Sequence, residues 1–539
     1  MTITSLPFVL FVLITVLIYY LMPIKKYQWV VIFVASCFFY IYNSLLYSFY
    51  ICFTITTIYL ASLKIHSIQV NTKKTIKEHK EDWSRDEKKA YKQKFETKTK
   101  TLLAVTLIAN FGILFVLKYF NSLFDYFASV MHLNEGGHSA LPSLILPLGI
   151  SFYTFQSTGY LIDVHRQTIE PERNPFKFAL FVSYFPQIIQ GPIAEFEKLG
   201  HQLTSEHKAE WIRFKHGFIL VLWGLFKKLI IADKMVNTIT TVSNDYASYS
   251  GSVIFVVALM YALQLYTDFS GGIDIIRGIS CVLGIDLEHN FKQPYFSKTL
   301  NEYWRRWHIS LGAWMKKYVF YPIAISGSSV KLSKAISNSK YGNSAFIKHI
   351  SQTLPAALAS LIVFLLIGIW HGSNSKYIGF GLWNGVIIMM STLLAPIFNS
   401  WAKALKIKTS SAIWKLFQMF RTFILVLVGY YFDIAPSLIG ALDMLKLSVF
   451  DNSLSITFKQ LREVGIARSD CLVLFYGFVV LLYFSIRLES SGAETPGEYL
   501  EKRSGLVQWL AVFIAIISIL LFGSYGPGFD AADFVYMGF

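Results

Sequence analysis

Long runs of apolar residues, separated by short basic loops, limit this chain more than any other feature of its sequence. Residues 354–370 and 506–522 each contain no charged side chain, and a helix needs roughly 20 apolar residues to cross a bilayer core about 30 Å thick. Only 15% of the residues are charged and 54% are apolar, whereas soluble domains carry roughly 25% charge. This composition excludes a disordered, collagen-like or disulfide-stapled secreted chain. The sequence therefore predicts an all-α polytopic membrane protein.

The apolar runs predict about twelve transmembrane helices, give or take two, plus re-entrant or interfacial helices. Residues 178–193 are better interpreted as re-entrant, because the run is short, has basic residues on both sides and contains Pro186 and Pro192. The predicted spans are residues 6–22, 28–44, 46–65, 101–119, 141–164, 218–239, 253–269, 354–370, 377–397, 417–432, 471–486 and 506–522.

The distribution of Lys and Arg predicts the orientation, since cytoplasmic loops carry an excess of these residues. Lys25 and Lys26 follow the first run directly and no basic residue precedes it, so we expect the N-terminus outside a bacterial cytoplasmic membrane. Residues 71–100, with eleven Lys and Arg against six Asp and Glu, form the expected cytoplasmic helical loop. Residues 121–140 lack Lys and Arg and are expected outside. The net charge of +16 thus reflects membrane topology, and no nucleic-acid partner is expected.

The domain organisation expected from these features has two parts. Residues 1–119 would form N-terminal transmembrane helices that include the basic loop 71–100, and residues 120–539 would form a catalytic core. No internal repeat at a fixed period is evident, which disfavours a transporter built from inverted halves.

Two histidines are candidates for chemistry, because ionisable residues at membrane depth are costly and usually functional. His371 ends an apolar run in Trp370-His371-Gly372, and its distance from the basic loop before that run places it at or beyond the midplane, toward the outer side. His308 lies in Trp304-Arg305-Arg306-Trp307-His308, among cations and so near the cytoplasmic entrance. Two histidines in opposite halves of the bilayer would suggest a route through the protein. Either could instead be a hydrogen-bonded histidine of the helix bundle.

Other residues admit more than one interpretation. Asp268 ends an apolar run at Ser270-Gly271-Gly272, where it would cap a following helix or hold a substrate-facing histidine. The Trp-Arg-Arg-Trp run could equally anchor the chain at the membrane interface. The sequence has no HExxH motif, no Cys/His cluster, no Walker A loop and no GxSxG elbow, so no metal site is predicted.

At these residues the sequence resembles the membrane-bound O-acyltransferase family, in its bacterial branch with alginate O-acetyltransferase and the teichoic acid D-alanyl transfer protein. The matching blocks run in order from about residue 180 to the C-terminus, and the combination of WRRWHIS with WHG is specific. They are residues 191–193, 266–274, 304–311 with 317–322, 370–372 with 382–385, and 533–539. Residues 326–352 depart from the pattern, being longer and richer in Lys than expected in the alginate enzyme.

The resemblance implies a ring of tilted helices with a central tunnel, entered by an acyl thioester from the cytoplasm and by the acceptor from outside. His371 would be the general base and His308 a second functional histidine. Substrate binding would fall to Trp304, Arg305, Arg306, Trp307, Asp268, Trp370 and Asn384. Lys316 and Lys317 are further candidates for the donor phosphates, although a positive-inside role explains the cations equally well.

The expected function is transfer of a short acyl group, acetyl from acetyl-CoA, across the membrane to an extracellular or cell-wall polysaccharide. No tightly bound cofactor is expected. The expected partners are the lipid bilayer, the thioester donor, the polysaccharide and an extracytoplasmic acetyltransferase protein. D-alanyl transfer to teichoic acid, a glycan or lipid-linked sugar transporter, and a non-enzymatic membrane scaffold stay open as alternatives.

Overall fold

The computed structural model of the chain describes residues 1–130, 146–451, 454–464 and 467–526. In these residues the regular structure is helical, and the one extended pairing is an isolated bridge between Phe291 and Trp307. The contacts divide the chain into two compact units, residues 1–217 with 279–288, and residues 218–278 with 289–539. The all-α fold class expected from the sequence is confirmed, whereas the division at residue 119 stays a prediction.

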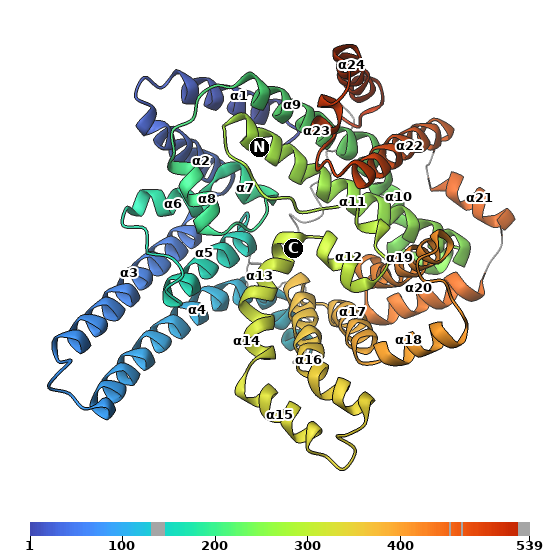
Figure 1. Cartoon of the computed structure of the whole chain (residues 1–539). Coiled ribbons are helices and arrows are strands. Elements are labelled where there is room, and N and C mark those ends of the chain that lie inside the picture. Colours follow the sequence, from blue (N-terminus) through green and yellow to red (C-terminus); the bar gives the residue numbers. More distant parts are fainter. Residues whose placement is uncertain (131–145, 452–453, 465–466, 527–539) are drawn as a thin grey trace. The chain divides into compact units, whose positions relative to one another are not determined.

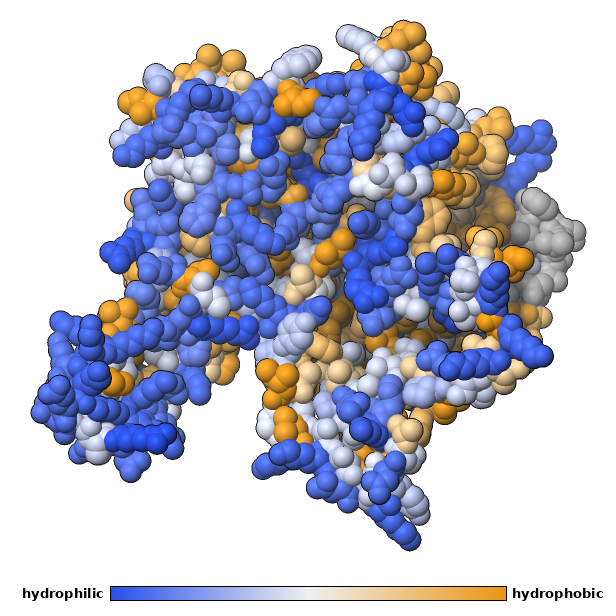
Figure 2. Space-filling model, viewed as in Figure 1, coloured by the Kyte–Doolittle hydropathy of each residue, from blue (hydrophilic) through white to orange (hydrophobic). Residues whose placement is uncertain are grey.

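The first unit contains a long helical hairpin formed by α3 (Ser48–Glu78) and α4 (Arg85–Val130). The two helices lie side by side, and their far ends form a hydrophilic tip (Figures 1 and 2). The basic residues 71–100 form this tip: they include the last turns of α3, a short turn and the first turns of α4. The helices of this unit are α1 (Leu6–Leu21), α2 (Gln28–Ser44), α3 (Ser48–Glu78), α4 (Arg85–Val130), α5 (Ile150–His165), α6 (Pro175–Ser183), α7 (Phe185–Gln190) and α8 (Phe196–Thr204).

The second unit contains the residues predicted to carry chemistry. Two π-helical segments, Phe226–Ala232 and Lys316–Phe320, interrupt its α-helices, and such segments are frequent at functional sites. Helix α9 (Trp211–Leu225) begins in the first unit and continues in the second, and α11 (Gly251–Val282) begins in the second unit and ends in the first. The other helices are α10 (Asp233–Asn244), α12 (Leu300–Arg306), α13 (Ile309–Met315), α14 (Tyr321–Ala324), α15 (Gly327–Ser337), α16 (Ala345–His371), α17 (Ser375–Leu393), α18 (Ala395–Ala404), α19 (Ala412–Ile434), α20 (Leu438–Phe450), α21 (Leu454–Glu463), α22 (Arg468–Ser491), α23 (Pro496–Glu501) and α24 (Gly505–Phe522).

Seven helices among the described residues are long and apolar enough to cross a membrane, namely α3, α4, α11, α16, α19, α22 and α24. An eighth is added if α17 and α18, bent by 63°, form one span. The count is below the twelve expected, because several expected spans are short or interrupted helices: α1, α2 and α5 have 16, 17 and 16 residues, and α9 continues into α10 through a π-helix. The segment expected to be re-entrant is two short helices, α6 and α7.

Close packing of α16 against α17 positions one end of the candidate site. A Cβ atom on Gly381 would lie 2.6 Å from the carbonyl oxygen of Phe364, and one on Gly368 would lie 2.2 Å from that of Tyr377. Only residues without a side chain allow two helix backbones to approach so closely. The short connection between the helices is closed by Asn374, whose side chain accepts a hydrogen bond from the backbone N–H of Lys376. His371, the last residue of α16, is thereby held against the first turns of α17.

Candidate active site

The segment that carries His308 is held by caps and by pairing with an upstream strand-like stretch. Thr299 caps α12 by accepting from the backbone N–H of Glu302, at 3.1 Å. After α12 ends, the backbone N–H of Lys292 donates to the carbonyl of Arg306 and that of Ile309 donates to the carbonyl of Asn290, each at 3.0 Å. His308 lies between these two bonds, so its backbone is fixed from both sides.

His308 has a backbone conformation that non-glycine residues rarely adopt. Its φ of 47° and ψ of 54° lie in the left-handed region, where a residue with a Cβ persists only if its surroundings hold it. The side chain amide of Asn290 does so: its Oδ1 accepts from the backbone N–H of Ser310 at 2.9 Å and lies 3.4 Å from His308 Nδ1. Because an amide oxygen can only accept, this contact favours a proton on Nδ1 and a lone pair on Nε2.

Burial also determines the charge of His308. The side chain is 3% exposed, and removal from water lowers its pKa to about 3. Desolvation disfavours the charged form of an imidazole, so His308 is neutral at physiological pH. A neutral ring can accept or relay a proton, whereas a permanently charged one could only donate.

Trp370 brings the two predicted histidines together. Its ring centroid lies 6.3 Å from that of His308 and 5.0 Å from that of His371. The two imidazoles are therefore no more than about 11 Å apart, which is little more than a third of a bilayer core. The sequence suggested that the two histidines lie in opposite halves of the bilayer. Two groups at this separation can lie on either side of the midplane, so that placement stays a prediction. His371 is itself buried, stacked on Tyr377 at 5.9 Å and set edge-on to Phe380 at 5.3 Å.

A cavity of about 520 Å³ opens beside His308. Four of the predicted site residues line it, namely Trp304, Arg305, Trp307 and His308. Lys316 adds a second cation, and most of the remaining wall is apolar. A largely apolar pocket with a few charged groups is typical of a site for a small organic ligand.

The cavity wall leads toward His371 along one face of α16. Phe364 and Ile367 line the cavity, and they precede His371 by seven and four residues, a spacing that places all three on the same helix face. His371 does not line the cavity itself. Phe380 completes the link, since its ring contacts both Trp304, at 6.0 Å, and His371.

Two predicted binding residues have supporting contacts in the structure. Asn384 accepts a hydrogen bond from Trp304 Nε1 at 3.1 Å and donates to the carbonyl of Phe380 at 2.9 Å, so it orients the indole. Arg306 does not line the cavity. Its guanidinium forms two hydrogen bonds with Glu489, at 2.8 and 3.0 Å, and an ion pair with Glu302 at 2.8 Å. It joins α12 to α22 and is less suited to bind a donor phosphate than Arg305.

Asp268 does not occupy the position that the sequence suggested. Helix α11 runs unbroken through Ser270, Gly271 and Gly272, so the expectation that Asp268 caps a following helix is wrong. Glycine here serves a crossing between helices: a Cβ on Gly224 of α9 would lie 2.5 Å from the carbonyl oxygen of Gly271. The two glycines let the helix backbones pack closely, and α11 continues through the position where the local sequence favours a helix end.

The crossing of α9 and α11 brings buried lysines against buried aspartates. Lys228 Nζ lies 2.7 Å from Asp268 and 2.9 Å from Asp233. Lys227 Nζ lies 2.7 Å from Asp274 and 2.8 Å from Ser270 Oγ. The sequence placed both lysines in an apolar run and required them to snorkel or face a cavity. It could not identify their partners on α11, which lie 40 to 47 residues away in the chain.

Asn290 and Ser360 are site residues that the sequence did not reveal. Asn290 fixes His308, and Ser360 lines the cavity. Neither belongs to a motif. The one local signal for Ser360 was its polar side chain among apolar neighbours on α16. Serine within an apolar helix is too common in membrane proteins for this signal to be specific.

The comparisons with known proteins identify the family of this chain. The fold and the site define a multi-pass helical membrane protein with two histidines around a buried tryptophan. Residues 171–338 match the model of the membrane-bound O-acyltransferase family, and this range contains His308 and the residues that line its side of the cavity. The final matching block of the sequence, residues 533–539, lies outside the described residues.

Curated relatives extend the match to His371 and beyond. The chain is 30% identical over 394 residues to a probable alginate O-acetylase of Pseudomonas putida, covering 71% of this chain and 72% of the relative. It is 28% identical over 461 residues to a peptidoglycan O-acetyltransferase of Helicobacter pylori, covering 80% and 76%. A teichoic acid D-alanyltransferase of Bacillus subtilis is 26% identical over 306 residues, covering 54% and 70%. For some Pseudomonas relatives the chain spans as little as 56% of their length. The chain belongs to the membrane-bound O-acyltransferase family.

Proposed function

We propose that this protein is an O-acyltransferase that moves an acetyl group from acetyl-CoA across the cytoplasmic membrane for O-acetylation of a cell-surface polysaccharide. The observation that carries the proposal is the presence of two buried histidines whose rings both contact Trp370, one of them lining a cavity with Arg305 and Lys316. The relatives named for O-acetylation of alginate and peptidoglycan support the acetyl group and the polysaccharide class.

In the proposed reaction an acceptor hydroxyl attacks the thioester carbonyl. The new C–O bond forms as the C–S bond breaks, and the hydroxyl proton moves through His371 to the departing thiolate. A thioester is already activated, so the protein needs mainly a base and a site that excludes water from the donor. A neutral imidazole is suited to that base. His308 would orient the thioester or relay a proton, and Asn384 would hold Trp304 against the donor.

The two sides of the membrane would have different roles. The donor enters from the cytoplasm, where Arg305 and Lys316 bind its phosphates and the apolar wall receives the pantetheine arm. The N-terminus lies outside, as the charge pattern predicts. An extracytoplasmic acetyltransferase protein would take the acetyl group to the polymer.

D-alanyl transfer is a second candidate, because relatives named teichoic acid D-alanyltransferase also match. Their alignment covers 54% of this chain, against 80% for the peptidoglycan enzyme. The acetyl donor is therefore preferred. Mass spectrometry of cell-surface polymers, with and without the gene, distinguishes acetyl from alanyl esters directly.

The central experiment replaces His371 by Gln, which keeps a hydrogen-bonding group but cannot take up a proton at neutral pH. General-base catalysis contributes typically 10²–10⁴-fold, so the acetyl ester content of the surface polymer should fall to the background of a deletion strain. The affinity of the purified protein for acetyl-CoA should change little, since the donor enters on the His308 side. Wild-type ester levels in this variant would refute the mechanism.

His349→Gln is the matched control. His349 lies near the other end of the same helix, α16, where its ring Nε2 is 3.0 Å from the carbonyl oxygen of Thr392. The same substitution there should leave ester levels intact. If both variants lost ester groups to the same degree, the loss at His371 would reflect damage to α16.

A further inference from the structure

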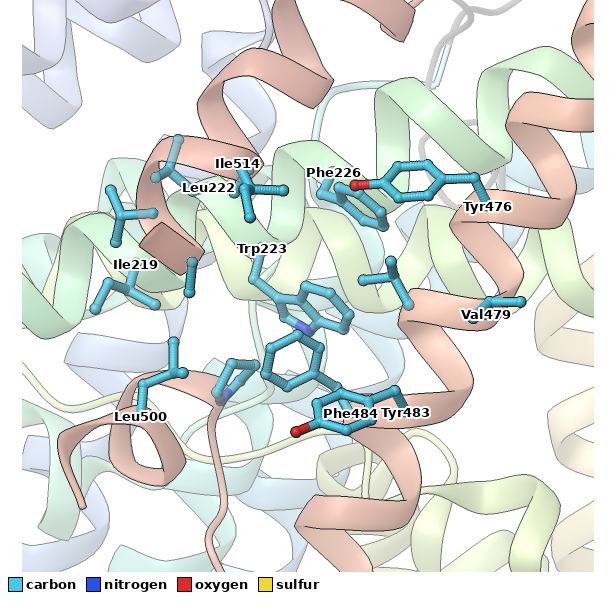
Figure 3. A pocket seen from close by; sticks show the side chains of 15 residues that line it. Ile219, Leu222, Trp223, Phe226, Tyr476, Val479, Tyr483, Phe484, Leu500 and Ile514 are labelled. Carbon is cyan, nitrogen blue, oxygen red and sulfur yellow. The ribbon is translucent and has the colours of Figure 1, made fainter. Parts of the chain in front are cut away.

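An apolar cleft on the second unit is lined by none of the residues proposed for catalysis. It encloses about 390 Å³, within the roughly 300–1,000 Å³ range of small-molecule sites. Figure 3 shows Trp223 of α9 and Phe226, the first residue of the π-helix that follows, facing Tyr476, Tyr483 and Phe484 of α22. α23 and α24 supply the rest of the wall. No charged side chain belongs to it.

The two helices that flank the cleft also present apolar side chains outward. α22 and α24 are both long and apolar enough to span the membrane, and both carry exposed apolar side chains that do not line the cleft, among them Phe475, Phe513 and Leu521. An exposed apolar helix surface of this kind belongs in contact with lipid. The cleft between these helices therefore opens to the hydrocarbon region, and its natural occupant is an acyl chain.

Two arginines lie at one end of the cleft. Arg487 is one helical turn beyond Tyr483, and its guanidinium lies 5.3 Å from the Tyr483 ring. Arg503 lies 4.9 Å from the ring of Tyr499 and donates a 2.8 Å hydrogen bond to its hydroxyl. The Tyr499 and Tyr483 hydroxyls are 3.5 Å apart, so the two tyrosines hold both cations at the same rim. Both arginines are exposed.

The same rim is linked to the basic segment before His308. Glu489, two residues after Arg487, receives both hydrogen bonds from Arg306. The charge pattern predicts that this segment faces the cytoplasm. The rim therefore lies at the depth of the inner leaflet's headgroups, where anionic lipids are attracted to basic residues.

We propose that the cleft binds one anionic glycerophospholipid of the inner leaflet. One acyl chain fills the apolar wall between α9, α22 and α24, and the phosphate binds Arg487 and Arg503. The bound lipid packs against Trp223 and against Phe226, the first residue of the π-helix that carries Lys227 and Lys228. Its occupancy should therefore stabilise the second unit independently of any acyl donor.

The test is native mass spectrometry of the purified full-length chain, titrated with phosphatidylglycerol or with phosphatidylcholine of the same acyl chains. Each basic group near an anionic lipid contributes about fivefold, so we expect one phosphatidylglycerol to bind roughly 25-fold more tightly than phosphatidylcholine. Arg487→Gln with Arg503→Gln should remove this preference. Ala515→Trp, which fills the cleft, should weaken both lipids.

Two matched controls keep the result specific. Arg468→Gln removes an exposed arginine from the opposite end of α22, and Leu521→Trp adds an indole to an exposed position of α24 outside the cleft. Neither should change lipid binding, and thermal unfolding reports whether each variant is folded. Equal affinities for the two lipids in the wild type would overturn the headgroup site. Unchanged binding in folded Ala515→Trp would overturn the assignment of the cleft.

Discussion

Replacing Lys228 by Met tests whether its buried ion pairs, which join the π-helix after α9 to Asp233 of α10 and Asp268 of α11, are structural. The Lys228 side chain is 2% exposed, and those of Asp268 and Asp233 are 0% and 7% exposed. Methionine keeps the length of the side chain but removes the ammonium group that both carboxylates face. Removing one partner of a buried ion pair costs about 3–5 kcal/mol, because the remaining charge cannot be hydrated.

That cost converts into a measurable shift in melting temperature. An unfolding entropy of about 2.1 cal/mol/K per residue, over 539 residues, gives an expected loss of about 3–4 °C. The assay is thermal unfolding of the detergent-solubilised protein, followed by tryptophan fluorescence. The double variant Lys228→Met with Asp268→Asn should regain part of the loss, since it also neutralises the deeper carboxylate.

An exposed lysine provides the control for Lys228→Met. Lys415→Met, at an exposed position of α19, should change stability by no more than about 0.5 kcal/mol. A loss below about 1 °C in Lys228→Met, or a further loss in the double variant, would show that the ion pair does not hold α9 to α11. If the double variant regains stability and still lacks acyl transfer, Lys228 or Asp268 has a role in the reaction beyond this pair.

Three further predictions follow from the site and from the topology. Burial lowers the pKa of His308 to about 3, whereas in the unfolded chain the pKa is near 6.5. The free energy of unfolding should therefore fall as the pH drops below about 6.5, by up to about 1.4 kcal/mol per pH unit. His308→Gln should make the decline in melting temperature between pH 6.5 and 5 shallower, and parallel curves for the variant and the wild type would contradict this. Gly381→Val places its Cβ against a carbonyl oxygen of α16 and should cost about 1–3 kcal/mol or more in thermal unfolding, whereas Gly327→Ala, which meets open space, should not. In a background without the four native cysteines, an impermeant thiol reagent on intact cells should label Phe127→Cys but not Arg85→Cys; the reverse pattern would invert the orientation.

Much of the candidate site could be predicted because its residues are close in sequence. Trp304, Arg305, Trp307 and His308 lie within five consecutive positions, and one turn of helix with its following residues is enough to bring them to a single cavity. His371 was recognisable from its place at the end of an apolar run, since membrane-embedded ionisable residues are rare. These signals depend only on local spacing and on the cost of placing charge in lipid.

Asp268 shows why the rest could not be predicted. Its local sequence, Asp-Phe-Ser-Gly-Gly, is typical of a helix end, because Gly is unfavourable within a helix. The contact with Gly224 reverses that preference: two helices that touch backbone to backbone gain more from packing than Gly loses in propensity. Such a contact depends on a residue 47 positions away, which no local pattern contains.

The sequence by itself determined the fold class, the membrane environment and the residue types of the site, because the hydrophobic effect and the positive-inside bias act on each segment separately. Only the tertiary structure decided which groups meet. It brought Trp370 into contact with both His308 and His371. It also paired Arg306 with Glu489, whereas Arg305 lines the cavity. Adjacent arginines point in different directions from a helix, and which one faces a carboxylate depends on the helix packed against it.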